Sequence, residues 1–267
     1  MDNSIALIYA PILLMTLFGL PHGALDAALL TTIGHSNRRT FAFVAYIAIA
    51  MICILIWFVA PTPAMFLFLA LSTWHFGRSD IVDQTPQHPL LHTVARGGVW
   101  SLFLPLYHWS STEPIFAQLN TDTFILKMGL VLAVSLWLLS GLRLLYVGLT
   151  DPHKKLPAAL LVGVMVAALL PPLWSLCAYF CAWHARRHTQ QTLARLSNTE
   201  NAVRLGRIIT VLTLVIAAVV FVAMPTEISV DTAVIRLFFV GIFALTVPHM
   251  ILIDYYLGRT NSLGAQA

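Results

Sequence analysis

The sequence predicts an all-α protein that crosses a membrane several times, and three observations lead to this prediction. Of its 267 residues, 59% are hydrophobic and only 10% are charged, whereas an ordinary soluble domain has about 25% charged residues. The hydrophobic residues gather in long runs. Several of these runs reach the roughly 20 residues that a helix needs to cross a hydrocarbon core, and they are too continuous for the alternating strands of a membrane barrel.

The first part of the chain predicts three of these helices. An apolar run over residues 5–20 continues to Ile33 and carries a histidine and an acid near one end. The run over 41–60 is long enough to span the bilayer, and the residues from Pro61 to Pro63 after it predict a tight turn. A third span begins with 64–76 and ends in a polar stretch.

The middle of the chain is less regular. The segment 94–109 is short and interrupted by glycines and a proline, so it spans the bilayer, tilts or re-enters. Residues 110–123 predict a polar loop, and 124–149 form a clear span. The apolar run over 156–183 is too long for one untilted span and is broken at Pro171 and Pro172, which favours either one kinked helix or two short ones.

Two further spans, over 208–224 and 234–257, complete a single integral-membrane domain over residues 1–267. We expect about seven or eight crossings, together with short re-entrant or broken helices. Lysine and arginine lie mostly in short connections, which are cytoplasmic in such proteins. The net charge of +4 therefore reflects topology and not a nucleic-acid partner, and the protein is expected in the plasma (inner) membrane.

Five histidines lie within or at the ends of the apolar helices. An ionisable group at membrane depth is costly unless it is paired or ligated. A single buried histidine is more often a hydrogen-bonded core residue, but five in the same half of the bilayer favour a metal site. Two of them are four residues apart, on one face of a helix, and are close enough to hold one ion. The five are His22, His75, His184, His188 and His249.

Imidazole ligands suit iron, copper, zinc and nickel, and the lack of a cysteine cluster argues against an iron–sulfur or structural zinc site. Ligation by four histidines would leave ferrous iron with open positions for oxygen. Asp26 lies four residues after His22 on the same helical face and is expected to accept the proton of a ligand imidazole. Asp80 follows His75 by five residues, a poorer match, so a capping or loop role is equally open. No catalytic residue beyond the metal centre is predicted.

Four motifs together resemble the bacteriorhodopsin-related-protein-like (Brp/Blh) family of β-carotene 15,15′-dioxygenases, over nearly the whole chain. They are Pro21-His22-Gly23-Ala24-Leu25-Asp26, Trp74-His75-Phe76-Gly77, Trp183-His184-Ala185-Arg186-Arg187-His188 and Pro248-His249-Met250.

The resemblance implies an enzyme that cleaves the central double bond of β-carotene with O2, and that gives two all-trans-retinal molecules for a microbial rhodopsin. It implies a non-haem Fe(2+) cofactor. The family's iron ligands carry over to four of the five histidines, whereas His249 is left open as a fifth ligand or a pocket residue. The four are His22, His75, His184 and His188.

Two other readings remain open. A membrane desaturase or hydroxylase acting on lipids is one, although such enzymes need about eight histidines for two irons. A non-enzymatic carotenoid or retinal carrier, or a rhodopsin assembly factor, is the other and needs no metal. Iron content separates them: about one atom per chain for the cleaving enzyme, about two for the lipid oxygenase and none for the carrier.

Overall fold

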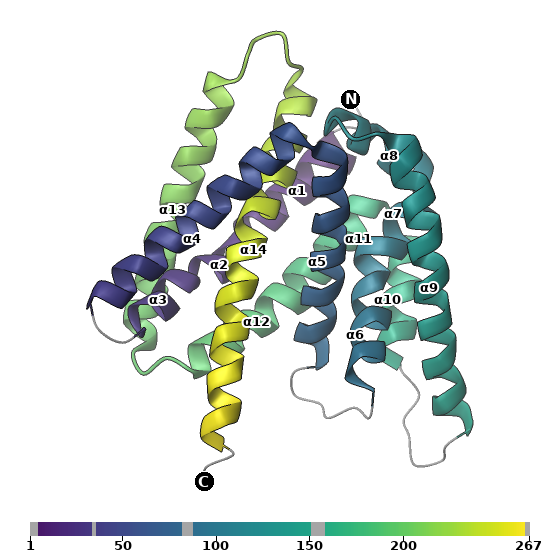
Figure 1. Ribbon diagram of the computed structural model, residues 1–267. Coiled ribbons are helices and arrows are strands. Elements are labelled where there is room, and N and C mark those ends of the chain that lie inside the picture. Colours follow the sequence, from purple (N-terminus) through teal and green to yellow (C-terminus); the bar gives the residue numbers. More distant parts are fainter. Residues whose placement is uncertain (1–4, 34–35, 82–87, 151–157, 265–267) are drawn as a thin grey trace. The chain divides into compact units, whose positions relative to one another are not determined.

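The computed structural model describes residues 5–33, 36–81, 88–150 and 158–264. Within these ranges all regular structure is helical and no strand occurs (Figure 1), which confirms the predicted all-α class. The chain divides into two compact units. Unit 1 comprises Met1–Thr16 and Ala60–Arg186, and unit 2 comprises Leu17–Val59 and Arg187–Ala267. That the two form one membrane domain stays a prediction.

The helices of unit 1 include three in which the backbone takes the wider π-helical turn. In chain order unit 1 contains η1 (Ile5–Tyr9), α1 (Ala10–Leu14), α5 (Pro61–Ile81), α6 (Pro89–Gly98), η3 (Val99–Phe103), α7 (Leu104–Tyr107), α8 (Trp109–Gln118), α9 (Thr123–Thr150), α10 (Ala158–Leu169), α11 (Pro172–Tyr179) and η4 (Phe180–Ala185).

The helices of unit 2 come from two separate stretches of sequence, and η2 and α12 each begin at the unit boundary. They are η2 (Met15–Gly19), α2 (Leu20–Ala24), α3 (Asp26–Thr31), α4 (Ser36–Val59), α12 (Arg186–Ala194), α13 (Thr199–Ala223) and α14 (Val230–Gly264).

Five helical stretches are long and apolar enough to cross a membrane, and α10 is a shorter apolar helix. Two of them, α4 and α13, point large apolar side chains outward as lipid contact requires: Phe41 and Phe58 on α4 are both 74% exposed, and Val222 on α13 is 83% exposed. The integral-membrane prediction is confirmed in this sense, while the count of seven or eight crossings stays a prediction. The five stretches are Ala6–Thr31, Ser36–Val59, Thr123–Thr150, Thr199–Ala223 and Val230–Asp254.

Two predictions of non-helical structure are wrong. The expected turn at Pro61 is the first residue of α5, because a proline in the first turn of a helix needs no backbone N–H partner. The expected polar loop over 110–123 contains α8. This helix ends where Asn120 adopts a left-handed conformation with φ 59°, and the N–H of Thr121 then bonds to the carbonyl of Phe116, a common way to end a helix.

The segment 94–109, whose form the sequence left open, continues as helix from α6 through η3 to α7. Its glycines allow very close packing. A Cβ on Gly97 would lie 1.8 Å from the carbonyl oxygen of Thr73, and a Cβ on Gly77 would lie 1.9 Å from that of Thr93. Helices α5 and α6 therefore touch backbone to backbone, and this fixes the position of α5 within unit 1.

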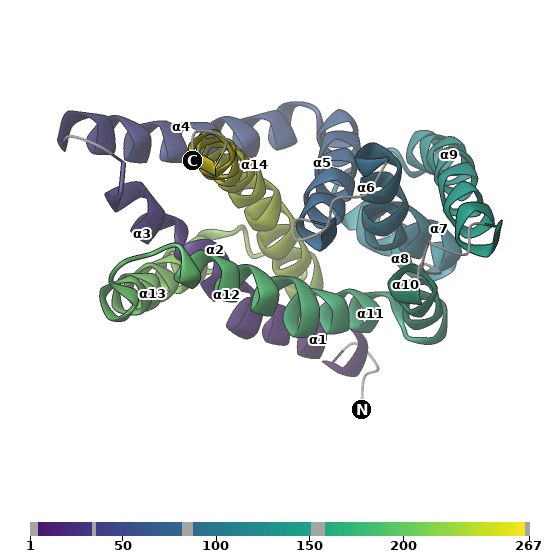
Figure 2. The same ribbon diagram turned by 90° about the horizontal axis from the view of Figure 1, so that it is seen from below.

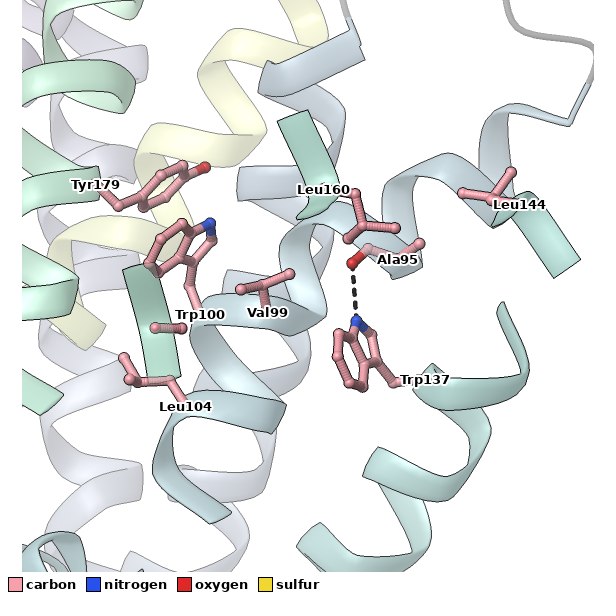
Figure 3. Close-up of a cluster of buried hydrophobic side chains, with 9 residues drawn as sticks. Ala95, Val99, Trp100, Leu104, Trp137, Leu144, Leu160 and Tyr179 are labelled. Atoms are coloured by element: carbon pink, nitrogen blue, oxygen red, sulfur yellow. Dashed lines mark hydrogen bonds between the residues drawn. The ribbon is translucent and has the colours of Figure 1, made fainter. Parts of the chain in front are cut away.

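The core of unit 1 lies between α6, η3, α9, α10 and α11. Helices α5, α6 and α9 lie side by side in both ribbon views (Figure 1, Figure 2). Trp100 of η3 stacks on Tyr179 of α11 with ring centroids 4.2 Å apart, and Trp137 of α9 donates a 2.8 Å hydrogen bond to the carbonyl of Ala95 (Figure 3). The first contact holds α11 against η3, and the second holds α9 against α6.

The break predicted at Pro171 is confirmed. Helix α10 ends at Leu169, Pro171 is extended with ψ 147°, and α11 begins at Pro172. Figure 2 shows α10 nearly end-on and α11 from the side, so the chain changes direction here. The hydroxyl of Ser175 bonds to the carbonyls of Val166 and Leu170, which satisfies groups that the break leaves open.

In unit 2, α14 crosses α4 and α13 packs on α2 and α3. Trp57 of α4 contacts Phe243 of α14 with ring centroids 5.3 Å apart. Nearer the other end of this crossing, Leu29 and Leu30 of α3 pack with Leu252 and Ile253 of α14. The crossing therefore brings α3, α4 and α14 together around one buried cluster of unit 2.

Candidate functional site

The five histidines singled out in the sequence form two groups. His75 and His184, called the histidine pair below, lie in unit 1. His22, His188 and His249, called the histidine trio, lie in unit 2. All five side chains are buried, with exposed fractions between 1% and 9%. Because an isolated buried imidazole is costly, each group calls for a physical explanation.

In the histidine pair, α5 carries His75 and η4 carries His184. Their Nε2 atoms face each other at 3.2 Å, and the ring centroids are 4.8 Å apart. Two imidazole nitrogens that each lie about 2.1 Å from one ion are about 3.0 Å apart at a right angle and about 3.4 Å apart at the tetrahedral angle. The observed separation lies between these values, so the pair fits two ligands of one ion.

Aromatic rings surround His184. Phe180 stacks parallel to its imidazole with ring centroids 5.7 Å apart and an interplanar angle of 13°. Phe76 contacts it edge-on at 4.9 Å, and Tyr179 lies 6.1 Å away. Parallel and edge-on arrangements are the ones that aromatic rings prefer. Ring packing therefore orients this imidazole and makes its surroundings apolar.

A hydrogen bond joins the two helical segments that carry the pair. The indole N–H of Trp183 on η4 donates to Oδ1 of Asp80 on α5 at 2.9 Å, and Arg96 of α6 donates to the backbone oxygen of Asp80 at 3.1 Å. Asp80 therefore has a role other than supporting a ligand or capping a helix: it holds η4 against α5 beside the histidine pair.

In the histidine trio, each ring lies near the other two. The ring centroids are 5.5 Å apart for His22 and His188, 5.5 Å for His22 and His249, and 4.8 Å for His188 and His249. Three imidazoles that share one ion have centroids about 4.6 to 5.3 Å apart, for metal–nitrogen distances of about 2.1 Å. The trio therefore has nearly the spacing of three ligands.

The Nδ1 atoms of the trio are engaged. Nδ1 of His22 donates to the carbonyl of Gly19, and Nδ1 of His249 donates to both carboxylate oxygens of Asp26, at 2.8 and 3.0 Å. Nδ1 of His188 lies 3.4 Å from the hydroxyl of Thr192. A neutral imidazole whose Nδ1 carries the proton has its lone pair on Nε2. For His22 and His249 the structure thus assigns Nε2 as the nitrogen that can ligate a metal.

The local sequence explains how His22 and His249 come to these positions. Each follows a proline, Pro21 at the start of α2 and Pro248 inside α14. Proline cannot donate a backbone hydrogen bond, and before Pro21 the backbone widens into the π-helix η2. Such single π turns are frequent at functional sites because they re-aim neighbouring side chains.

The carboxylate of Asp26 meets the imidazole of His249 on α14, and its support of a metal ligand stays a prediction. Tyr46 of α4 donates a second hydrogen bond to Oδ2 of Asp26 at 2.9 Å. Sequence reasoning missed Tyr46, because no spacing rule connects a tyrosine with an acid 20 residues earlier. A polar side chain inside the otherwise apolar run over 41–60 was the one available signal.

As the side chains stand, no three or more His, Cys, Asp or Glu among the described residues are arranged so that they could hold a metal ion. The spacing of the pair and of the trio nevertheless suits imidazole ligation. The donor chemistry of both groups fits a first-row transition metal bound by nitrogen.

Three other histidines lie within the described residues. Nε2 of His108 bonds to the carbonyl of Ala167 at 2.8 Å, a contact within unit 1. His88 is exposed just before α6, and His92 lies half-buried on it. His35 and His153 lie outside the described residues.

Comparison with known proteins decides the family. A model of the family described as "Beta-carotene 15,15'-dioxygenase" matches residues 13–256. The chain belongs to this family. This confirms the resemblance seen in the four motifs, and the match contains all five histidines together with Asp26 and Tyr46.

Two relatives match nearly the whole chain. The chain is 30% identical over 250 residues to a β-carotene 15,15′-dioxygenase of uncultured marine bacterium 66A03, and the match covers 91% of each protein. It is 26% identical over 291 residues to a probable β-carotene 15,15′-dioxygenase, Blh, of Halobacterium salinarum, covering 92% of this chain and 84% of that protein. No solved structure matches the chain.

Proposed function

We propose that this protein is a β-carotene 15,15′-dioxygenase, which cleaves the central double bond of β-carotene with O2 to give two all-trans-retinal molecules. Membership of the family and the names of two relatives that match over nine-tenths of the chain support the reaction. One observation supports a metal site in this chain: the Nε2 atoms of His75 and His184 face each other at the separation of two ligands of one ion.

The proposed centre contains Fe(2+) held by four histidines, two from the histidine pair and two from the trio. The link between the groups is the sequence itself, because His184 and His188 are only four residues apart. When bound, ferrous iron supplies the redox chemistry with O2 that no side chain can supply. The proposed ligands are His22, His75, His184 and His188.

The chain's own side chains would orient the ligands and exclude water. The Gly19 carbonyl fixes the tautomer of His22, and Phe180 stacks on His184. The apolar rings of Phe76 and Tyr179 near His184 suit a hydrocarbon polyene, and an active site without free water suppresses competing reactions. The substrate is proposed to enter from the bilayer of the plasma (inner) membrane, and the retinal to serve a microbial rhodopsin.

The test is expression in a bacterium that makes β-carotene, with retinal measured by chromatography and iron measured in the purified protein. We expect retinal and about one iron per chain, the number that a single mononuclear centre binds. His184→Ala and His188→Ala are expected to abolish retinal while leaving membrane insertion intact. His88→Ala, an exposed histidine, is the matched control and should retain activity. Loss of β-carotene without retinal, or retinal from either ligand variant, would overturn the proposal.

A further inference from the structure

The observation that carries furthest is the chain of hydrogen bonds from Tyr46 through Asp26 to His249, which lies entirely in unit 2. Tyr46 donates to Oδ2 of Asp26 at 2.9 Å, and the same oxygen accepts from Nδ1 of His249 at 2.8 Å. Asp26 is 3% exposed and His249 is 4% exposed. Burying a carboxylate costs free energy even when it is hydrogen-bonded. We therefore ask which function this buried carboxylate serves.

The direction of these hydrogen bonds fixes the chemistry of His249. An ionised carboxylate only accepts, so Nδ1 of His249 carries the proton, and in the neutral ring the lone pair is then on Nε2. The ring then stands with its centroid 4.8 Å from that of His188 and 5.5 Å from that of His22. A carboxylate behind the distal nitrogen is the usual partner of a metal-binding histidine, where it fixes the ring and makes it more basic.

Resting on the proposed iron centre, we propose that His249 is a further ligand through Nε2, and that Asp26 and Tyr46 are positioning residues that act through it. The hydroxyl of Tyr46 holds the carboxylate of Asp26 against His249. Asp26 also brings a negative charge next to a site where imidazoles alone would leave the full charge of the cation uncompensated.

A purely structural reading of the same contacts is a polar tie between α3, α4 and α14. That reading accounts for Asp26, Tyr46 and Nδ1 of His249, but not for three imidazole rings whose centroids lie within 5.5 Å of one another. Burying them costs desolvation. A shared cation is what makes such a cluster favourable.

The test uses the full chain, purified in detergent and stripped of metal, with Co(2+) as the probe. The affinity and the visible absorption spectrum of bound Co(2+) report the ligand set directly and do not depend on catalysis. The metal-free protein is also melted thermally, because a structural tie would show there. Wild-type protein that binds no Co(2+) and no iron would overturn the proposed function, independently of the role of His249.

Asp26→Asn is the sharpest variant. The amide NH2 can donate to Nδ1 of His249 and so push the proton onto Nε2, which then cannot ligate. We expect the Co(2+) affinity to fall about 10- to 100-fold and the spectrum to change. Tyr46→Phe keeps the ring packing and removes only the hydroxyl, so a loss of several-fold is expected. Tyr146→Phe makes the same change on α9, where the side chain is 60% exposed, and should leave the affinity unchanged.

His249→Gly tests ligation itself. The variant should lose Co(2+) affinity, and imidazole added to the solution should restore both the affinity and the wild-type spectrum by filling the vacated space. A tie between helices would not be rescued in this way. The proposal is overturned if His249→Gly and Asp26→Asn keep the wild-type spectrum and affinity, or if imidazole restores neither. It is also overturned if these variants lower only the melting temperature of the metal-free protein.

Discussion

The histidine pair of unit 1 and the histidine trio of unit 2 use the same side chain but support it in different ways. Around the pair, the neighbours of His184 are aromatic rings, with Phe180 stacked on it and Phe76 edge-on. Behind the trio lie hydrogen-bond acceptors, the carbonyl of Gly19 and the carboxylate of Asp26. One group is oriented by packing and the other by directional polar contacts.

This difference separates two demands that an iron centre for an apolar substrate must meet. Aromatic walls offer a polyene dispersion contact without competing for the metal, so the pair is suited to the substrate side of the chemistry. A carboxylate and a fixed tautomer set ligand basicity and charge, so the trio would tune the proposed metal, to which both groups contribute ligands. Substitutions around the pair and around the trio should therefore impair different properties of the protein.

The largest effect is expected from removing one ligand of each group in turn. His75→Ala and His22→Ala should each lower retinal production at least 100-fold and should each lower bound iron to near zero, because one centre cannot form without either group. Retinal and iron per chain are measured in the same preparations, with His88→Ala as the control. If each variant kept about half of the iron, the pair and the trio would be two separate sites, and the single-centre proposal would fail.

A second large effect tests the scaffold that holds the pair. In Gly77→Ala, the new Cβ would lie 1.9 Å from the backbone oxygen of Thr93, and backbone cannot move aside as a flexible side chain can. We expect destabilisation by about 1 to 3 kcal/mol, the usual range for overpacking, with loss of both folded protein and retinal. Gly141→Ala on α9, where a Cβ would meet nothing within 4 Å, is the matched control. Thermal unfolding in detergent measures the difference.

Much of the fold follows from the sequence because lipid imposes simple rules on it. The runs over 41–60, 124–149, 208–224 and 234–257 correspond to α4, α9, α13 and α14, since an apolar stretch of span length must satisfy its backbone as a helix. The break at Pro171 follows from the chemistry of proline. The helix α8 did not follow, because its polar residues resemble a loop and its end depends on a single left-handed residue, Asn120.

The buried histidines of the candidate site were predictable, and the residues that support them were not. Burial cost alone singles out the five histidines in apolar runs, and the four-residue spacing of His184 and His188 is visible in any sequence. Tyr46 and Trp183 act through partners that are distant along the chain, Asp26 and Asp80. Which helices cross, and at which residues, depends on tertiary packing such as the contact of Gly77 with Thr93, and no local pattern specifies it.

A smaller effect should separate the aromatic wall from the metal ligands. Phe180→Leu keeps an apolar side chain but removes the ring stacked on His184, so the imidazole loses its packing partner while every proposed ligand remains. We expect the rate of retinal formation to fall by about five- to tenfold, as misplacement of a reacting group does, with iron per chain unchanged. Phe58→Leu on the exposed face of α4 is the control. Loss of iron in Phe180→Leu would mean that packing, and not only ligation, holds the metal.

The smallest effect concerns the hydrogen bond between η4 and α5. Trp183→Phe removes the donor to Oδ1 of Asp80, and because the Trp183 side chain is 47% exposed, the smaller ring gives up little buried area. The expected cost is about 1 kcal/mol, or a melting temperature lower by about 2 to 4 °C for a chain of this size. Trp174→Phe is the matched control, since its indole donates to the uncharged backbone oxygen of Ala6 at 2.8 Å. Equal shifts in the two variants would mean that the carboxylate of Asp80 is no better an acceptor than a backbone carbonyl, and that its charge adds nothing to the contact between η4 and α5.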